Sequence, residues 1–275
     1  MVRTTEITPC PALQSFIRCY TLREFNTGDE DFIKPLPAYH EVTISFILAG
    51  NFFSSKNSSS DHVAGHRSHL VGLQTETKGA IIFNGDIKFF TILFKPNGFY
   101  RLYGIPLNTI TDNIYNLADI SLKGVDEYND RLNEAKNLQE LKNLSDKFFV
   151  SHLNKSKSKD PYSSITSTSS LIFDTNGNVN IKSLASDANM SLRSFEMNFT
   201  QQVGIPPKLF SRITRFNYAL MIKMKNMSKS WTDICHHCGY YDQMHFIKEF
   251  KQFTGNTPLN FYKNTPLPIE DYRKG

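Results

Sequence analysis

The chain has 275 residues, of which 40% are hydrophobic and 13% aromatic, so it can bury a core, and its length favours two domains over one. No run of about 18 uncharged apolar residues occurs, and the first ten residues lack a basic segment followed by an apolar run; both observations argue against a membrane span and a secretory signal. The net charge of +5 lies in residues 161–275, which hold 13 Lys and Arg against 8 Asp and Glu; this favours a polyanionic partner, although a role in solubility would explain it equally well.

The cysteines are too few for a disulfide scaffold in a chain of this length, so we expect all four to be reduced: Cys10, Cys19, Cys235 and Cys238. Together with the composition, this predicts a cytoplasmic protein.

Strand patterns dominate the N-terminal half. Apolar residues recur at every second position from Val42 to Leu48, which predicts a half-buried strand. In residues 80–94 the pair Asn84-Gly85 separates two apolar runs and predicts a tight hairpin. Farther on, helical spacing of apolar residues predicts one amphipathic helix over residues 126–149, which packs on its own sheet or on a second subunit.

These patterns divide the chain into four parts. Residues 1–153 are predicted to form an α+β domain that is rich in strands, shaped as a barrel or a sandwich, and closed by a helix. A stretch rich in Ser, Thr and Lys supplies a linker at residues 154–161. Strand signals then nearly vanish, so we expect an all-α domain over residues 162–265 and a tail over residues 266–275.

The helical domain contains an internal repeat. Residues 199–207 and 250–258 share Phe, Gln, Gly and Pro at an offset of 51. In each copy the sequence predicts a short helix, a tight turn and a second helix, with Ser191 and Asp242 as the N-caps of the second helices and Gly204 and Gly255 at their C-terminal ends. This order is typical of a helix-turn-helix, whose second helix presents its first residues to a DNA groove.

One helix is predicted to join the two copies. Pro207 suits a first helical turn, and apolar residues continue at helical spacing to Met227. About 19 residues at 1.5 Å each span roughly 28 Å, and adjacent major-groove faces recur every ~34 Å. We therefore expect the two recognition helices to enter successive turns of the major groove.

These residues resemble the AraC/XylS family. Residues 233–262, DICHHCGYYDQMHFIKEFKQFTGNTPLNFY, are similar to its signature of a Gly-aromatic turn, His-Phe, a basic residue, Phe-Lys and Gly-x-x-Pro-x-x-Tyr, and the first copy resembles the family's first unit. The resemblance implies a bihelical DNA-binding domain that regulates transcription, often with a ligand-binding or dimerising companion domain. Two positions depart from the family, which commonly has Arg or Lys in place of Met197 and Arg in place of Lys263.

Residues that face away from the expected core of each recognition helix are candidates for base contacts. Arg193 suits guanine, Glu196 cytosine and Met197 the methyl group of thymine, while Gln243 suits adenine and Lys248 suits guanine or a phosphate. The full set is Arg193, Ser194, Glu196, Met197, Gln243, Met244, Ile247 and Lys248. Candidates for phosphate contacts are Ser191, Lys208, Ser211, Arg212, His245, Lys251 and Gln252. For each of these side chains, a solvated or backbone-facing position is the alternative.

Two clusters have the composition of a metal site. Residues 235–238, Cys-His-His-Cys, are consecutive on one helix and point in about four directions, so they cannot close a tetrahedron. His62, His66 and His69 fall in a loop that contains a glycine, and solvated histidines are the simpler interpretation. Since phosphate loops, nucleophile elbows and catalytic carboxylate pairs are also missing from the sequence, we expect no enzyme, no metal and no cofactor.

Residues 94–120 loosely resemble the segment that closes the β-rich sensor domains attached to this class of DNA-binding unit. The resemblance implies an interior for an apolar effector, lined by Phe46, Phe83, Phe89 and Phe94, although these rings would equally fill a core. The expected partners are double-stranded DNA, a small-molecule effector, a second copy of the chain and the transcription machinery, with no membrane. Alternative hypotheses are a DNA-acting enzyme with a fused helix-turn-helix domain and a ligand-independent DNA-binding protein.

Overall fold

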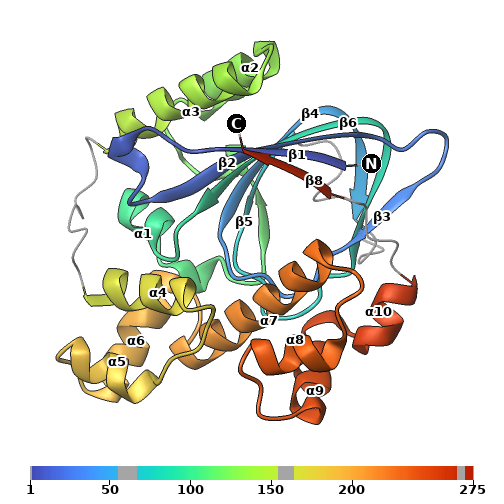
Figure 1. Ribbon diagram of the computed structural model, residues 1–275. Helices are drawn as coiled ribbons and strands as arrows, with labels where there is room; N and C mark the ends of the chain where they lie inside the picture. The colour runs from blue at the N-terminus through green and yellow to red at the C-terminus, as the bar shows by residue number, and fades with distance from the viewer. Residues whose placement is uncertain (1, 55–66, 154–163, 265–269, 275) are drawn as a thin grey trace.

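The computed structural model describes residues 2–54, 67–153, 164–264 and 270–274. An N-terminal β-sheet domain closed by helices is followed by a helical domain (Figure 1), which confirms the predicted fold class. The N-terminal elements are β1 (Val2–Ile7), η1 (Pro11–Leu13), β2 (Ile17–Asn26), β3 (Phe32–Pro35), β4 (Thr43–Ser54), β5 (Ser68–Val71), β6 (Ala80–Phe94), α1 (Gly98–Tyr103), η2 (Leu107–Thr109), β7 (Ile114–Asn116), η3 (Leu117–Asp119), α2 (Val125–Glu134) and α3 (Leu138–Leu153). The elements that follow are α4 (Ser164–Asp174), α5 (Ile181–Asp187), α6 (Leu192–Val203), α7 (Pro207–Lys225), α8 (Trp231–His237), α9 (Gln243–Thr254), α10 (Pro258–Asn264) and β8 (Glu270–Lys274).

A single curled sheet forms the N-terminal domain. Its strand order is β7-β5-β4-β6-β2-β1-β8, with β3 also paired to β6. The pairing of β1 with β8 is parallel and the other pairings are antiparallel, so residues 270–274, from the segment expected to be a tail, add an edge strand to the N-terminal sheet. Helices α2 and α3 cover one face of the sheet, where the ring of Tyr128 contacts that of Phe46 and the ring of Phe149 contacts that of Phe94.

The strand predicted from Val42 to Leu48 is present in β4, but it is not half-buried. Thr43 and Ser45 are buried on one face of the sheet, as Ile44 and Phe46 are on the other. Both faces of β4 are covered here, so the alternation of residue types does not report solvent exposure.

The hairpin predicted at Asn84-Gly85 is wrong. Strand β6 runs through this pair without turning, because both of its halves already have neighbours: β3 pairs with residues 80–83 and β2 with residues 86–94. Gly85 does adopt a positive φ of 91°, and the register with β4 shifts nearby, between Ala49 and Asn51. The glycine therefore serves a bulge inside a long strand instead of a turn.

The single helix predicted over residues 126–149 is also wrong, since α2 and α3 are separate. Helix α2 ends at Glu134, and a new cap forms at Asn137, whose Oδ1 accepts a hydrogen bond from the backbone N–H of Glu140 at 3.0 Å. The carboxylate of Glu140 in turn accepts from the N–H of Lys136 at 2.9 Å. These local bonds stabilise a break that the apolar spacing alone does not reveal.

The helical domain has the predicted order of elements, with two additional helices, α4 and α10. Helix α4 lies at the start of the predicted all-α domain, in a Ser- and Thr-rich stretch for which we predicted no helix, yet it buries Ile165 and Ile172 seven residues apart. That spacing of two helical turns is the signal that the composition obscured. The linker predicted at residues 154–161 lies outside the described residues.

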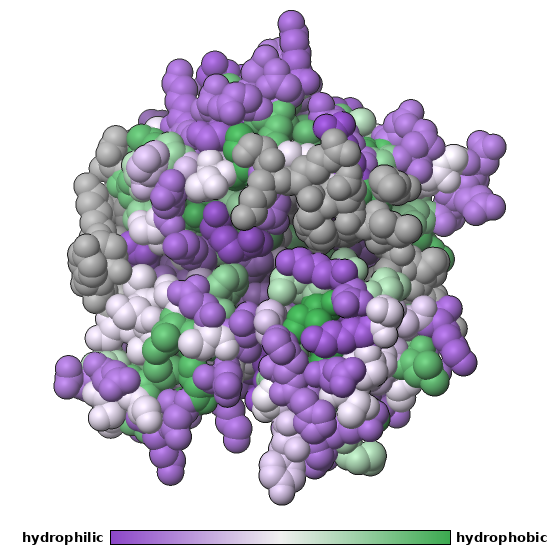
Figure 2. All heavy atoms as spheres, in the orientation of Figure 1, coloured by the Kyte–Doolittle hydropathy of each residue, from purple (hydrophilic) through white to green (hydrophobic). Residues whose placement is uncertain are grey.

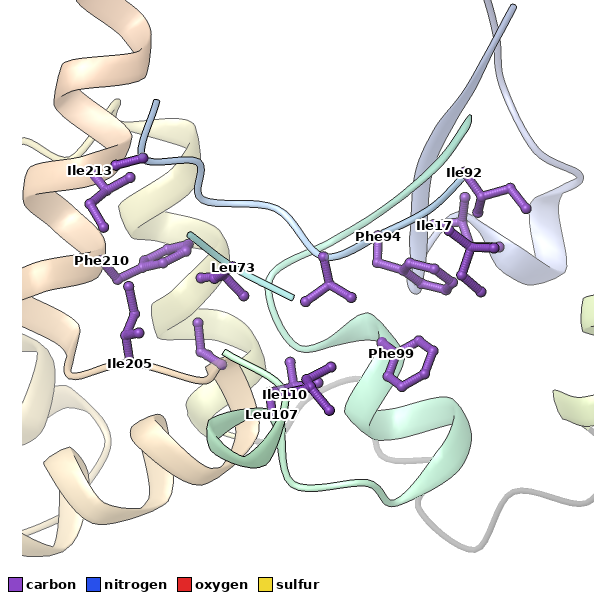
Figure 3. Packing of buried hydrophobic residues seen from close by; sticks show 14 of the residues in the cluster. Ile17, Leu73, Ile92, Phe94, Phe99, Leu107, Ile110, Ile205, Phe210 and Ile213 are labelled. Carbon is purple, nitrogen blue, oxygen red and sulfur yellow. The ribbon is translucent and has the colours of Figure 1, made fainter. Parts of the chain in front are cut away.

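The sheet and the helices share one apolar core. Figure 3 shows Leu73, Leu107 and Ile110 of the N-terminal domain beside Ile205, Phe210 and Ile213 of the helical domain. All six are buried, and Phe210 and Ile213 belong to α7. The helix that joins the two helix-turn-helix units is therefore packed directly on the N-terminal domain. Within the described residues no helix is long and apolar enough to cross a membrane.

Candidate nucleic-acid interface

The first helix-turn-helix consists of α5, a turn at residues 188–190, and α6. The side chain of Asn180 caps α5 by accepting from the N–H groups of Lys182 and Ser183, and Ser191 caps α6 by accepting from the N–H of Ser194 at 3.2 Å. Asn189 adopts a φ of 54° within the turn. Polar side chains are favoured at such caps because the first N–H groups of a helix lack partners inside it.

One face of α6 belongs to the core and another faces outward. Phe195, Phe199 and Val203 are fully buried at spacings of four. Three base-contact candidates are exposed, namely Arg193, Glu196 and Met197, whereas Ser194 is half-buried. Met197 is 63% exposed to solvent.

The second helix-turn-helix repeats this design. Ser230 caps α8, and Asp242 caps α9 by accepting from the N–H of His245 at 2.7 Å. Phe246, Phe250 and Phe253 are buried, and a T-shaped contact of 5.4 Å between the rings of Phe216 and Phe250 ties α9 to α7. Of the candidates on α9, three are exposed and one is half-buried against the core: Gln243, Met244 and Lys248, and Ile247.

Tyr241 was not among the candidates predicted from the sequence, although it immediately precedes the N-cap residue of α9 and is 92% exposed. The neighbouring Tyr240 is buried against the ring of Phe246. Two consecutive tyrosines before an N-cap residue were the available signal, because successive residues of an extended segment point in opposite directions.

The candidates for phosphate contacts separate into two groups. Ser191, Lys208, Lys251, His245 and Gln252 are exposed. Ser211 is buried, and its hydroxyl donates to the carbonyl of Gly177 at 2.6 Å. Arg212 is half-buried, and its guanidinium donates to Glu249 and Gln252. Both Ser211 and Arg212 are thus engaged inside the protein, where their contacts fix α7.

Glu249 is the centre of a buried ion cluster between α7 and α9. Its carboxylate lies 2.5 Å from Nε of Arg212, 3.7 Å from Arg215 and 3.6 Å from the imidazole of His245. Nη2 of Arg212 also donates a hydrogen bond to Oε1 of Gln252 at 2.7 Å, and the guanidinium carbon of Arg212 lies 5.4 Å from the ring centroid of Phe253. Because one arginine on α7 contacts three side chains on the second unit, the cluster sets the orientation of the second recognition helix.

The exposed face of α6 lines a groove of about 950 Å³. Arg193, Glu196 and Met197 contribute one wall, and η2 with its flanking proline contributes another through Pro106, Asn108 and Thr109. The N-terminal domain therefore stands directly beside the base-contact candidates of the first unit.

Hydrogen bonds hold both helix-turn-helix units against the N-terminal domain. The hydroxyl of Thr111 donates to the carbonyl of Gly204 at the end of α6, at 2.9 Å. The N–H of Ala38 donates to the carbonyl of Phe253 on α9 at 2.9 Å, and its carbonyl accepts from Asn217 of α7 at 3.1 Å. Nearby, burial between aromatic rings lowers the pKa of the His40 imidazole to about 4.

The four phenylalanines that were expected to line an effector pocket do not face one space. Phe89 and Phe94 are five residues apart in β6 and point to opposite faces of the sheet. Phe94 packs on Phe99 and Phe149, and Phe46 packs on Tyr128, on the side covered by α2 and α3. Phe83 contacts Phe89, with ring centroids 6.3 Å apart.

The described residues contain no group of three or more His, Cys, Asp or Glu arranged for a metal. Cys235 and Cys238 are buried, and burial raises the pKa of both thiols, that of Cys238 to about 11, so they are poor sources of the thiolate that zinc requires. His69 is buried beside the ring of Phe52, whereas His62 and His66 lie outside the described residues.

Comparisons with known families match both halves of the chain. Residues 184–264 match the family described as "Helix-turn-helix domain", and residues 5–116 match "Domain of unknown function (DUF6597)". No curated protein matches the chain.

Several solved structures are similar to the chain. ToxT from Vibrio cholerae O395 shares 13% identity over 90% of this chain and 98% of that chain, with a TM-score of 0.48. Unsaturated fatty acid bound wild-type ToxT from Vibrio cholerae strain SCE256 shares 13% identity over 88% and 94% of the two chains, with a TM-score of 0.48. A transcriptional regulator with an AraC-type DNA-binding domain, from Chromobacterium violaceum, shares 24% identity over 38% and 94%, with a TM-score of 0.34.

Proposed function

We propose that the protein is a sequence-specific DNA-binding transcription regulator of the AraC type without catalytic activity, since residues 184–264 match a helix-turn-helix family. One observation carries the proposal: two capped recognition helices, α6 and α9, expose the side chains of their first turns on units joined by one helix. The first turn of a recognition helix is the part that contacts base edges. With this function we also propose a cytoplasmic location.

The length of α7 supports binding to successive turns of DNA. Its 19 residues span roughly 28 Å at the helical rise of 1.5 Å per residue, close to the ~34 Å that separates adjacent major-groove faces. Figure 2 shows the helical domain as two lobes separated by a notch, with mostly hydrophilic side chains at their lower ends.

Selection of duplexes from a random pool by the purified full chain tests the proposal. We expect an enriched site with two blocks separated by about one helical turn. Binding that is equally strong on all sequences would contradict it. The sequence analysis also expects a second copy of the chain as a partner, and sedimentation of the chain with and without the selected duplex tests this homodimer.

Arg193→Ala is expected to relax specificity within one half of the selected site. An arginine bonded to guanine O6 and N7 contributes about 1 to 3 kcal/mol of discrimination, and Arg193 is exposed on the outer face of α6. Competition between the site and duplexes changed at single positions measures the effect. Lys208→Ala is the matched control, since loss of a phosphate contact at this exposed residue lowers affinity equally for all sequences. A uniform loss for Arg193→Ala would identify it as a phosphate contact.

We further propose that the N-terminal domain controls access of DNA to α6. The groove that contains Arg193, Glu196 and Met197 is walled on another side by η2, so DNA that enters it must pass this turn. The contact between Thr111 and Gly204 keeps η2 in place.

Thr111→Val is therefore expected to raise DNA affinity by about three- to tenfold, the equivalent of one hydrogen bond of roughly 0.5 to 1.5 kcal/mol. Valine keeps the shape of the side chain but removes the hydroxyl. Fluorescence anisotropy of a labelled duplex measures the change. Thr175→Val is the control: Thr175 directly follows α4 and its hydroxyl donates to carbonyls of that helix, so the DNA affinity of this variant should match that of the unchanged chain. Unchanged or weaker binding by Thr111→Val would contradict control through η2.

For a small-molecule effector, we propose the face of the sheet opposite α2 and α3 in place of the four phenylalanines. Thr21, Thr91 and Ser45 are direct cross-strand partners and form a buried polar row there. The hydroxyl groups of Thr21 and Thr91 have no hydrogen-bond partner among the described residues. Buried polar groups are normally paired, so this row favours a polar effector. DNA affinity that stays constant across a screen of polar metabolites would favour the ligand-independent alternative.

A further inference from the structure

The start of α9 carries the two most exposed large apolar side chains of the described residues. Tyr241 is 92% exposed to solvent and Met244 is 75% exposed. They lie three positions apart, on either side of the capping residue and the first residue of the helix. Exposed apolar residues that occur singly are ordinary, but two large ones at the tip of one recognition helix call for a function.

Local packing fixes both side chains outward. Tyr240 turns into the core, where its ring contacts Phe246 at 5.0 Å, and this directs Tyr241 to the other side of the chain. Phe246 and Phe250 occupy the buried stripe of α9. Met244 is two residues before Phe246 and thus about 200° from it around the helix. The exposure of Tyr241 and Met244 therefore follows from the buried positions of Tyr240 and Phe246.

The two units differ in chemistry at these positions. The internal offset of 51 aligns Met244 with Arg193, Tyr241 with Met190 and Ile247 with Glu196. Where the first unit exposes a guanidinium and a carboxylate, the second exposes the thioether of Met244, and Ile247 is half-buried against the core. Met190 is half-buried against the core, so the first unit has no counterpart to the exposed ring of Tyr241.

Among the base edges in the major groove, the C5-methyl group of thymine is the apolar one. Resting on the proposed function, we propose that Tyr241 and Met244 are specificity-determining residues that contact thymine methyl groups, so the half-site of α9 is rich in A·T pairs and that of α6 contains G·C pairs. Gln243, between them, suits the adenines of the same pairs. Figure 2 shows near-white and pale green side chains among the hydrophilic ones at the lower end of the lobe formed by α8 and α9.

Deoxyuridine provides the test, because it lacks the thymine methyl group and keeps every hydrogen-bonding atom. Each thymine of the selected site is replaced in turn, and the affinity of the full chain is measured. Removal of one contacted methyl group is expected to weaken binding about fourfold, from the transfer free energy of one buried carbon. We expect such positions in the α9 half-site. In Met244→Ala, at least one of them should lose its sensitivity to uracil.

Met227→Ala is the matched control, since Met227 is also exposed but follows the far end of α7, and it should retain the full uracil sensitivity. Met244→Ala removes an exposed side chain, so an unchanged melting temperature verifies its fold. A selected site that tolerates uracil throughout the α9 half, or an unchanged uracil profile in Met244→Ala, would overturn this inference alone. If the random pool yields no preferred site, the proposed function and this inference both fail. This result is known before any uracil measurement is made, so it can be distinguished from failure of this inference alone.

Discussion

Glu249→Ala is expected to lower the free energy of unfolding by about 2 to 3 kcal/mol and to weaken binding chiefly at the second half-site. Removing one partner of a buried ion pair typically costs about 3 to 5 kcal/mol, because the remaining charge stays buried without compensation. Arg212 is 29% exposed here and can turn to water, which reduces the loss. The Arg212 contacts that orient α9 through Gln252 and Phe253 would relax with it.

Glu249→Gln separates charge from hydrogen bonding, because the amide oxygen can still accept from Nε of Arg212. We expect Glu249→Gln to lose less than half as much free energy of unfolding as Glu249→Ala loses. Chemical denaturation followed by circular dichroism measures these values, and titration with duplexes altered in one half-site measures binding. Glu127→Ala is the comparison, since its pair with Arg131 is exposed and 3.6 Å long, and such pairs contribute about 0 to 1 kcal/mol. Equal effects of Glu127→Ala and Glu249→Ala would show that the α7–α9 cluster contributes little.

Gly177→Ala is expected to destabilise the first helix-turn-helix by about 3 kcal/mol. Gly177 has a φ of 78°, and a Cβ at this position would lie 2.1 Å from the backbone oxygen of Ser211 and 3.0 Å from the backbone nitrogen of Arg215. A non-glycine residue in the left-handed region costs about 1 to 2 kcal/mol, and forcing an extra carbon into a packed core adds about 1 to 3 kcal/mol. The turn between α4 and α5 would have to move away from α7.

The second unit offers a matched control for this substitution. Gly239 has a φ of 70°, but the nearest atom to an added Cβ is 3.7 Å away. Gly239→Ala should therefore show the backbone cost alone. At about 2 °C of melting temperature per kcal/mol for a chain of this size, we expect falls of about 6 °C for Gly177→Ala and about 3 °C for Gly239→Ala. Equal falls would indicate that the contact with Ser211 relaxes at no cost.

The candidate interface could be predicted from sequence wherever the positions depend on one helix. Helical spacing placed Phe195 and Phe246 inside, which left Arg193 and Lys248 outside, as the structure has them. Ser211 and Arg212 were placed with the phosphate contacts because their own helix gives no reason to bury them. Their partners, Gly177 and Glu249, lie more than 30 residues away in the chain.

By itself, the sequence determined the ends and the buried faces of the recognition helices. The caps at Ser191 and Asp242 and the left-handed glycines Gly204 and Gly255 act through bonds that span four residues or fewer, so they can be recognised without knowledge of the fold.

The tertiary structure decided what depends on distant partners. Asn84-Gly85 bends a strand instead of closing a hairpin because β2 and β3 already pair with the two halves of β6. The position of η2 beside α6, and the orientation of α9 through Glu249, likewise arise from contacts between segments far apart in the chain. Local bonds are encoded within a few residues, whereas strand pairing and burial depend on which segments meet after the chain has folded.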